Sequence, residues 1–263
     1  MKALYREVIK INQMADNQDK AAAAQSFFNE LNQMSLPEKF NWAKEIFEDL
    51  HVQDTPDKTA LIWNDIHTGE ASSFTYLELL QKANKIINFL SARGIGHGNN
   101  MYLMAPVVPQ IWFASLACIK AGMVTVPTAT TMTERELEFR FETYRPDVIL
   151  ADPGSADLID RAAKETGISP KVKLILGQKQ GWTSFEEIEK EADQAQAADT
   201  RSHETLFCFF TSGTTGLPKR VGHTASSYPL GHLSTTVMIG VRPDDVHHNL
   251  SAPGWAKWAW SSF

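Results

Sequence analysis

Apolar residues in the first fifty positions recur at the spacing of helix turns. In the stretches 21–34 and 36–50 most of them recur after three or four residues, the spacing of one side of a helix: Phe27, Leu31, Met34, Phe40, Trp42, Ile46, Phe47 and Leu50. The pattern predicts a helical N-terminal extension over residues 1–50 that packs against a larger body.

From Thr59 onward, short apolar runs alternate with amphipathic stretches. The runs predict strands at 60–63, 101–105, 124–128, 148–151, 173–177 and 206–210, and the polar stretch 64–72 predicts a hairpin that leads into 73–76. Helices are expected between the later runs and over 184–195. Such alternation is typical of parallel βαβ units with flanking helices, so the predicted fold class is α/β.

Local signals mark several of these helix ends. Thr75 with Glu78, and Thr133 with Glu136, have the spacing of a capping box, in which each side chain binds a free backbone N–H at a helix start. Gly122 follows the stretch that begins at Pro109, and a glycine in that place commonly ends a helix.

The nine residues after the run 206–210 combine groups that bind phosphate. They are Thr211, Ser212, Gly213, Thr214, Thr215, Gly216, Leu217, Pro218 and Lys219. The glycines allow backbone amides to approach an anion, the four hydroxyls can donate to phosphate oxygens, and the lysine adds a positive charge. The alternative is a surface turn, which is often rich in Gly, Ser and Thr. Hydroxyls and a lysine in one run after a buried strand favour a phosphate-binding loop.

This loop differs from the common nucleotide-binding motifs. A Walker loop places Lys directly after Gly, whereas here Leu217 and Pro218 separate Gly216 from Lys219, and a Rossmann G-x-G-x-x-G is absent. The run 211–219 instead resembles the signature loop of the adenylate-forming superfamily, which includes acyl-CoA synthetases, luciferases and peptide-synthetase adenylation domains.

The resemblance extends over about residues 45 to 263. Segments 101–128, 223–232 and 251–260 are similar to the family's segments on either side of the loop, and the last two most resemble medium-chain and acetyl-CoA synthetases. Many members have Gly after the loop lysine, where this chain has Arg220. Its side chain would either add positive charge near the phosphates or point to solvent.

The resemblance implies an activity. A carboxylate would attack the α-phosphate of Mg²⁺-bound ATP to give an acyl-adenylate, and CoA would displace AMP to give a thioester; the loop would hold the β- and γ-phosphates. The implied substrates and cofactors are a small-molecule carboxylic acid of short or medium chain, ATP, Mg²⁺ and CoA. Two alternatives stay open: an adenylating enzyme that loads a carrier protein, and a non-catalytic nucleotide-binding fragment.

Other motifs of the family are absent from the 263 residues. These are an aromatic-Gly-x-Thr-Glu motif, an aspartate for the ribose and the lysine of a mobile C-terminal domain, so no catalytic residue is assigned. The sequence also ends in the apolar run WAWSSF, and chain termini are usually exposed. The expectation is a partial AMP-binding domain over 51–263, truncated before the C-terminal half and inactive alone.

Three further candidates have competing interpretations. The resemblance makes Trp255 a wall of the acyl pocket, whereas the alternative is that Trp255, Trp258 and Trp260 all pack in a core. Arg140 would contact CoA phosphates or, by default, lie on a solvated and ion-paired helix face. The resemblance places His223 on a helix after the loop, in a structural hydrogen bond. The histidine spacing fits no familiar zinc pattern, so no metal site is expected.

Composition narrows the remaining choices. The net charge of −6 argues against a general nucleic-acid surface. Cys118 and Cys208 lie among apolar residues, which predicts two buried thiols, no disulfide and a cytoplasmic location. No apolar run approaches the ~20 residues of a membrane span, and no secretory signal is evident. The sequence leaves the oligomeric state open, an oligomer included.

Overall fold

A computed structural model describes residues 1–211, 218–260 and 262. Its main sheet has seven strands in the order β7-β6-β5-β3-β4-β8-β9. Neighbouring strands run parallel, except that β9 is antiparallel to β8. The strands are β3 (Asn100–Met104), β4 (Val124–Pro127), β5 (Val148–Ala151), β6 (Val172–Ile175), β7 (Thr183–Ser184), β8 (Thr205–Thr211) and β9 (Lys219–Thr224).

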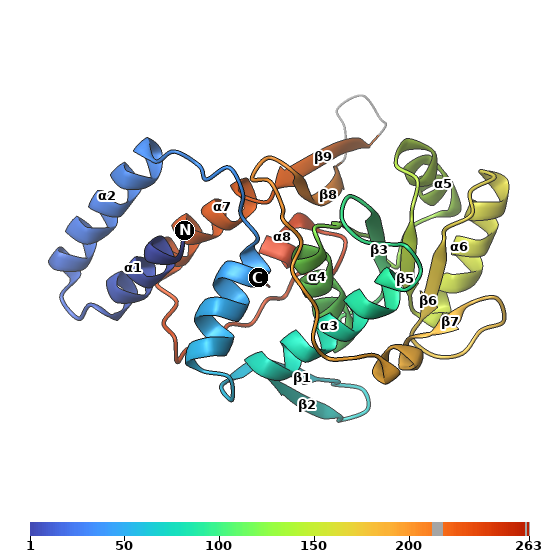
Figure 1. Cartoon of the computed structure of the whole chain (residues 1–263), viewed down its shortest axis with the longest axis horizontal. Coiled ribbons are helices and arrows are strands. Elements are labelled where there is room, and N and C mark those ends of the chain that lie inside the picture. Colours follow the sequence, from blue (N-terminus) through green and yellow to red (C-terminus); the bar gives the residue numbers. More distant parts are fainter. Residues whose placement is uncertain (212–217, 261, 263) are drawn as a thin grey trace.

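Helices cover both faces of this sheet (Figure 1). On one face lie α3 (Tyr76–Ser91) and α4 (Pro109–Ala121), and on the other lie α5 (Glu134–Thr143) and α6 (Pro153–Glu165). Strands buried on both faces read as continuous apolar runs, which is why the central strands were visible in the sequence. The predicted α/β fold is confirmed.

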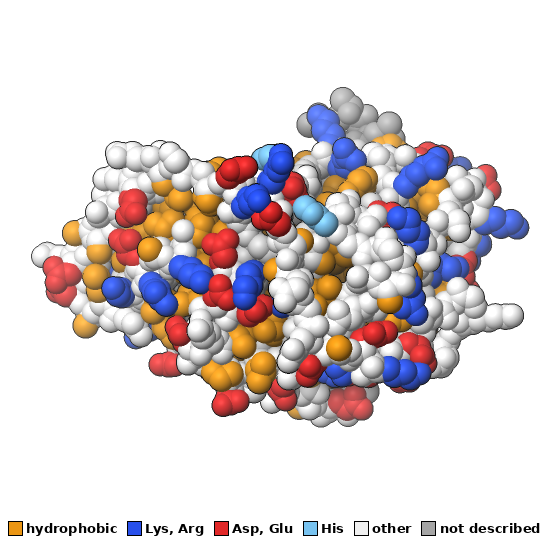
Figure 2. All heavy atoms as spheres, viewed as in Figure 1, with side chains coloured by type: hydrophobic (Ala, Val, Ile, Leu, Met, Phe, Trp, Pro, Cys, Tyr) orange, Lys and Arg blue, Asp and Glu red, His pale blue; other side chains and the backbone are white. Residues whose placement is uncertain are grey.

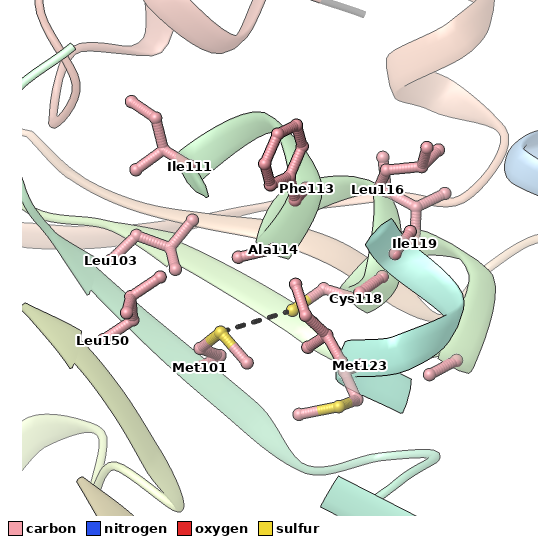
Figure 3. Close-up of a cluster of buried hydrophobic side chains, with 14 of the residues drawn as sticks. Met101, Leu103, Ile111, Phe113, Ala114, Leu116, Cys118, Ile119, Met123 and Leu150 are labelled. Atoms are coloured by element: carbon pink, nitrogen blue, oxygen red, sulfur yellow. Dashed lines mark hydrogen bonds between the residues drawn. The ribbon is translucent and has the colours of Figure 1, made fainter. Parts of the chain in front are cut away.

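Sulfur and aliphatic side chains fill the core between β3 and α4 (Figure 3). Cys118 Sγ lies 4.0 Å from Met101 Sδ. Burial raises the pKa of the Cys118 thiol to about 12, and that of Cys208 to about 11. Both cysteines are free and buried, so the prediction of two buried thiols is confirmed.

The first fifty residues form helices that reach the main body. They comprise α1 (Lys2–Gln13), α2 (Asn17–Gln33) and the π-helix η1 (Ala43–Val52). The apolar faces of α1 and α2 pack against α7 (Ser227–Ile239), while η1 places Ala43 and Phe47 in the core beside α3 and α4. The division at residue 50 stays a prediction, and η1 crosses it. In the described part of the chain, no helix has the length and apolar character needed to cross a membrane.

Local sequence signals predicted several boundaries correctly. The side chains of Thr75 and Thr133 complete capping boxes at the starts of α3 and α5. The predicted hairpin is β1 (Thr59–Asn64) paired with β2 (Ala71–Thr75). Gly122 ends α4 with φ 66°, and a Cβ there would lie 2.7 Å from the His97 ring, so both conformation and space require glycine.

The helix predicted over 184–195 is wrong. Only η2 (Phe185–Lys190), a 3₁₀ helix, forms there, and the chain then runs extended along α3. Amide side chains of α3 explain the difference: Asn84 donates to the Asp193 carbonyl, and Asn88 donates to the carbonyls of Ala192 and Gln194. These bonds fix residues 192–194 against α3 in a conformation that is not helical.

A candidate phosphate-binding hairpin

The predicted loop joins the last two strands of the sheet. Cα atoms of Thr211 and Lys219 pair at the loop end of the β8–β9 hairpin, and both residues are exposed. The predicted residues Ser212, Gly213, Thr214, Thr215 and Gly216 lie outside the described residues. The structure therefore places the two ends of the loop opposite one another, at the carboxyl end of a strand in a parallel sheet. Ligands of open α/β sheets bind at that edge.

Strand β8 is held from both sides. Phe207 and Phe209 belong to the core beneath α3 and α4, whereas Cys208 and Phe210 belong to the core beneath α5 and α6. Strand β9 is instead an exposed edge strand, and β8 is its neighbour in the sheet. The outer half of the hairpin projects at the top of Figure 1. A rigid strand thus carries Thr211, and a less supported one carries Lys219.

Two arginines, Arg220 on β9 and Arg140 on α5, lie at the hairpin. Arg220, which follows Lys219, has its guanidinium carbon 4.9 Å from the centroid of the Tyr144 ring at the C-cap of α5. Arg220 is exposed overall but rests on an aromatic ring. In Figure 2, Lys and Arg side chains lie along the upper edge of the molecule around the hairpin and α5.

The expectation that Arg140 lies on a solvated helix face is wrong. Its side chain is only 7% exposed, and its guanidinium carbon lies 4.7 Å from the centroid of the Phe210 ring. Burial lowers the pKa of Arg140. Leu137 and Phe141 are buried on the same helix, so Arg140 belongs to the side of α5 that faces the sheet. The charged composition of the helix hid this, because burial depends on a strand far along the chain.

The three tryptophans after α7 differ in environment. Trp258 is buried in α8 (Ala256–Trp260), and Trp260 donates to Thr235 Oγ1 at 3.0 Å. Trp255 is 67% exposed, so it does not pack in a core as the alternative interpretation requires. The preceding Gly254 has φ 100°, and a Cβ there would lie 2.5 Å from the Ala129 backbone nitrogen. The acyl-wall role of Trp255 stays a prediction.

The placement of His223 on a helix is also wrong, because His223 lies on β9. Its ring contacts the rings of Phe209, Tyr228 and Trp260, and burial lowers its pKa. The sequence did not predict β9, because the first four residues of this edge strand are exposed and it lacks an apolar alternation. Within the described residues, no group of three or more His, Cys, Asp or Glu side chains is arranged to hold a metal ion.

A hollow of about 550 Å³ lies elsewhere, between α1, η1, β1, α4 and α7. Its walls include Trp42, Trp112 and Leu233, whereas Thr211, Lys219 and Trp255 do not line it. The hollow also includes Lys58 and Arg242 in its walls, but most of its lining is apolar, whereas the hairpin ends present a hydroxyl and an ammonium group at an exposed edge, which suit a polyphosphate.

Comparisons with known proteins identify the family of the chain. The chain matches the model of the family described as AMP-binding enzyme over residues 49–256. It is 42% identical over 248 residues to 4-hydroxybutyrate–CoA ligase 1 of Metallosphaera sedula, covering 90% of this chain and 43% of that protein. It is 32% identical over 237 residues to a mitochondrial acyl-coenzyme A synthetase of Homo sapiens, covering 87% and 40%.

Solved structures share the fold. The acetoacetyl-CoA synthetase of Streptomyces lividans matches with a TM-score of 0.77 at 22% identity, covering 85% of this chain and 36% of that one. An acyl-CoA synthetase of Brucella canis matches with a TM-score of 0.75 at 18% identity, covering 97% and 44%. The chain spans about two fifths of the length of the curated relatives, 43% and 40%. It belongs to the AMP-binding enzyme family, and its relatives in that family are acyl-CoA synthetases and ligases.

Proposed function

We propose that this chain contributes the site that binds the phosphates of ATP to an enzyme that joins a short- or medium-chain carboxylic acid to CoA through an acyl-adenylate. The observation that carries the proposal is the pairing of Thr211 with Lys219 at the exposed carboxyl end of β8, in a chain of the AMP-binding enzyme family. The relatives named as CoA ligases support the acceptor, and the relative named for 4-hydroxybutyrate favours a short acid.

The described residues would act by charge and position. Lys219 would neutralise the outer phosphates, and the Thr211 hydroxyl would donate to a phosphate oxygen across the hairpin. Ser212, Gly213, Thr214, Thr215 and Gly216 are proposed to line the same anion by resemblance. Mg²⁺-bound ATP supplies the adenylyl group, and CoA supplies the acceptor thiol. The exposed Trp255 is proposed to contact the acyl group.

Measuring the binding of ATP to this chain tests the proposed phosphate-binding site. Isothermal titration calorimetry with Mg²⁺-bound ATP should show binding that Lys219→Ala weakens at least about tenfold, since a charge-assisted contact contributes roughly 1.5–3 kcal/mol. Lys190→Ala is the matched control, because Lys190 is an exposed lysine paired with Glu187 on η2. Equal affinities for the wild type and Lys219→Ala would refute the role of Lys219.

A turnover assay tests whether this chain catalyses the reaction. We propose that the 263-residue chain binds nucleotide but completes no synthesis, because it lacks the family's ribose and C-terminal lysine motifs. Pyrophosphate release is measured with butyrate, 4-hydroxybutyrate, hexanoate and benzoate, each with and without CoA. Clear turnover with any of these acids would overturn the claim and would identify the substrate class directly.

A further inference from the structure

Two cation–ring contacts join α5 to both strands of the hairpin, and they are reciprocal. The helix supplies the cation for β8, because Arg140 lies over the ring of Phe210 at 4.7 Å. The helix end supplies the ring for β9, because Arg220 lies over Tyr144 at 4.9 Å. Phe210 and Arg220 are themselves paired across the two strands. All four side chains therefore meet at one rung of the hairpin.

That rung is the one next to the paired ends of the loop. Phe210 precedes Thr211, and Arg220 follows Lys219. Successive residues of a strand are only ~3.3 Å apart, so a rung fixed on α5 limits where the next rung can move. The restriction matters most for β9, since it is an exposed edge strand with support from β8 on one side. The Arg220–Tyr144 contact joins its outer end to the body.

The end of α5 is itself fixed to the centre of the sheet. The hydroxyl of Tyr102 on β3 donates to the carbonyl of Tyr144 at 2.6 Å and to that of Arg140 at 3.3 Å. Tyr102 is buried, so these bonds are protected from water. A continuous path of contacts thus leads from the central strand through α5 to the hairpin.

Aromatic rings suit this place better than carboxylates would. A carboxylate would also hold an arginine, but it would cancel positive charge close to the proposed anion. A ring face attracts the guanidinium and leaves its charge in place, and such contacts contribute about 0.5–2 kcal/mol. Among the described residues, Nη1 of Arg140 has no hydrogen-bond partner, although the charge of Glu136, one turn earlier on α5, also acts on Arg140.

We propose that Arg140 and Arg220 are positioning residues, which fasten both strands of the hairpin to α5 and thereby set the distance between Thr211 and Lys219 across the bound phosphates. The inference rests on the proposed function, and it adds residues outside the signature loop. It also assigns a role to Arg220, which stands where many family members have glycine: its contact with Tyr144 holds β9 against α5.

The experiment uses the ring as the variable, since changing Tyr144 leaves the number of charges unchanged. Tripolyphosphate affinity is measured by calorimetry for the wild type, Tyr144→Leu and Tyr144→Phe. Tyr144→Leu should weaken binding about fivefold, as expected for loss of one contact of this kind. Tyr144→Phe keeps the ring face and should bind like the wild type. Thr143→Ala, at an exposed and uncharged position on α5, is the control for a change on the same helix.

A double-mutant cycle separates positioning from general stability. If Tyr144 acts by placing Lys219, then Lys219→Ala should cost less affinity in the Tyr144→Leu background than in the wild type. A merely structural role would lower the melting temperature of Tyr144→Leu and leave the two losses additive. Additive losses, or equal affinities for the Leu and Phe variants, would overturn the proposal.

Hydrogen exchange gives a readout that needs no ligand. Backbone amides of β9 should exchange faster in Tyr144→Leu than in Tyr144→Phe, because the tether is lost only in the first. If the wild type binds neither ATP nor tripolyphosphate, the proposed function fails, while the exchange rates still test the tether. Unchanged exchange in β9 would then overturn the tether as well.

Discussion

Lys120 on α4 and Arg140 on α5 are buried cations on opposite faces of the same sheet. Lys120 Nζ lies 2.7 Å from Glu48 Oε2 and donates to Asn84 Oδ1 at 2.8 Å. Arg140 lies over the Phe210 ring, and among the described residues its Nη1 has no hydrogen-bond partner. Lys120 thus contacts an acid and an amide, whereas Arg140 contacts an aromatic ring.

If the proposed function is correct, the difference separates a charge that stabilises the fold from one that positions the hairpin. Lys120 links α4 to η1 and α3, and its charge is cancelled by Glu48. Breaking such a pair leaves a carboxylate uncompensated, which is costly. The Arg140 guanidinium lies over a ring instead, and Glu136 acts on it as a charge one turn earlier on the same helix. A group whose pKa is shifted by burial and a nearby charge is a candidate for a functional site.

The largest effect is expected at Lys120. Lys120→Met should lower the free energy of unfolding by about 3 kcal/mol, near the lower end of the range for breaking a buried pair, because Glu48 keeps its contact with Lys44. Urea unfolding followed by circular dichroism measures the loss. Lys44→Met is the matched control, since Lys44 is 43% exposed and binds the same carboxylate, and it should cost less than about 1 kcal/mol. Equal losses would remove the distinction between the two lysines.

The same pair predicts a pH dependence. Burial alone would raise the pKa of Glu48, but hydrogen bonds from Lys120 and Lys44 outweigh it, and the pKa is lowered from its ordinary value of 4.5. A carboxyl whose pKa is lower in the folded state stabilises the fold above 4.5, and this stabilisation is lost as the pH falls through the folded value. The gap in unfolding free energy between the wild type and Lys120→Met should therefore narrow below that pH. A gap that stays constant down to acid unfolding would contradict the assignment.

Sequence alone could reach features that depend on neighbouring residues. The capping boxes at Thr75 and Thr133 were predicted because both partners lie within one helix turn. The environment of Lys120 was not predicted, because Glu48 and Asn84 come from other elements. Strand β9 was missed because its exposed residues carry no apolar alternation.

The candidate site divides in the same way. Thr211 and Lys219 were predicted from a local motif, and the structure pairs them across the hairpin. The contribution of Arg140 could not be predicted, because its partner Phe210 belongs to a strand much later in the chain. The roles of Ser212 to Gly216 and of Trp255 stay predictions, since family membership assigns no single residue its task.

A smaller effect is expected at Tyr102, which fixes the end of α5. Tyr102→Phe removes the hydroxyl that donates to the carbonyls of Tyr144 and Arg140, and should cost about 1 kcal/mol of unfolding free energy. Tyr76→Phe is the control, at a partly exposed ring that stacks on His51, and should change stability by less than about 0.5 kcal/mol. Urea unfolding measures both. If α5 fastens the hairpin as proposed, Tyr102→Phe should also speed amide exchange in β9, and protection equal to the wild type would contradict the proposed link.

The smallest change in stability is expected at Arg140, although it is as deeply placed as many core residues. Arg140→Met loses the contact with Phe210, but it also removes a charge whose burial is unfavourable, and an unbranched apolar side chain can fill the space. The free energy of unfolding should therefore change by less than about 1 kcal/mol, whereas the same substitution at Lys120 costs several times more. The effects on tripolyphosphate affinity should be the reverse of those on stability. Affinity should fall in Arg140→Met and stay at the wild-type value in folded Lys120→Met. A loss of stability at Arg140 equal to that at Lys120, with affinity unchanged, would mean that both buried cations serve only the fold.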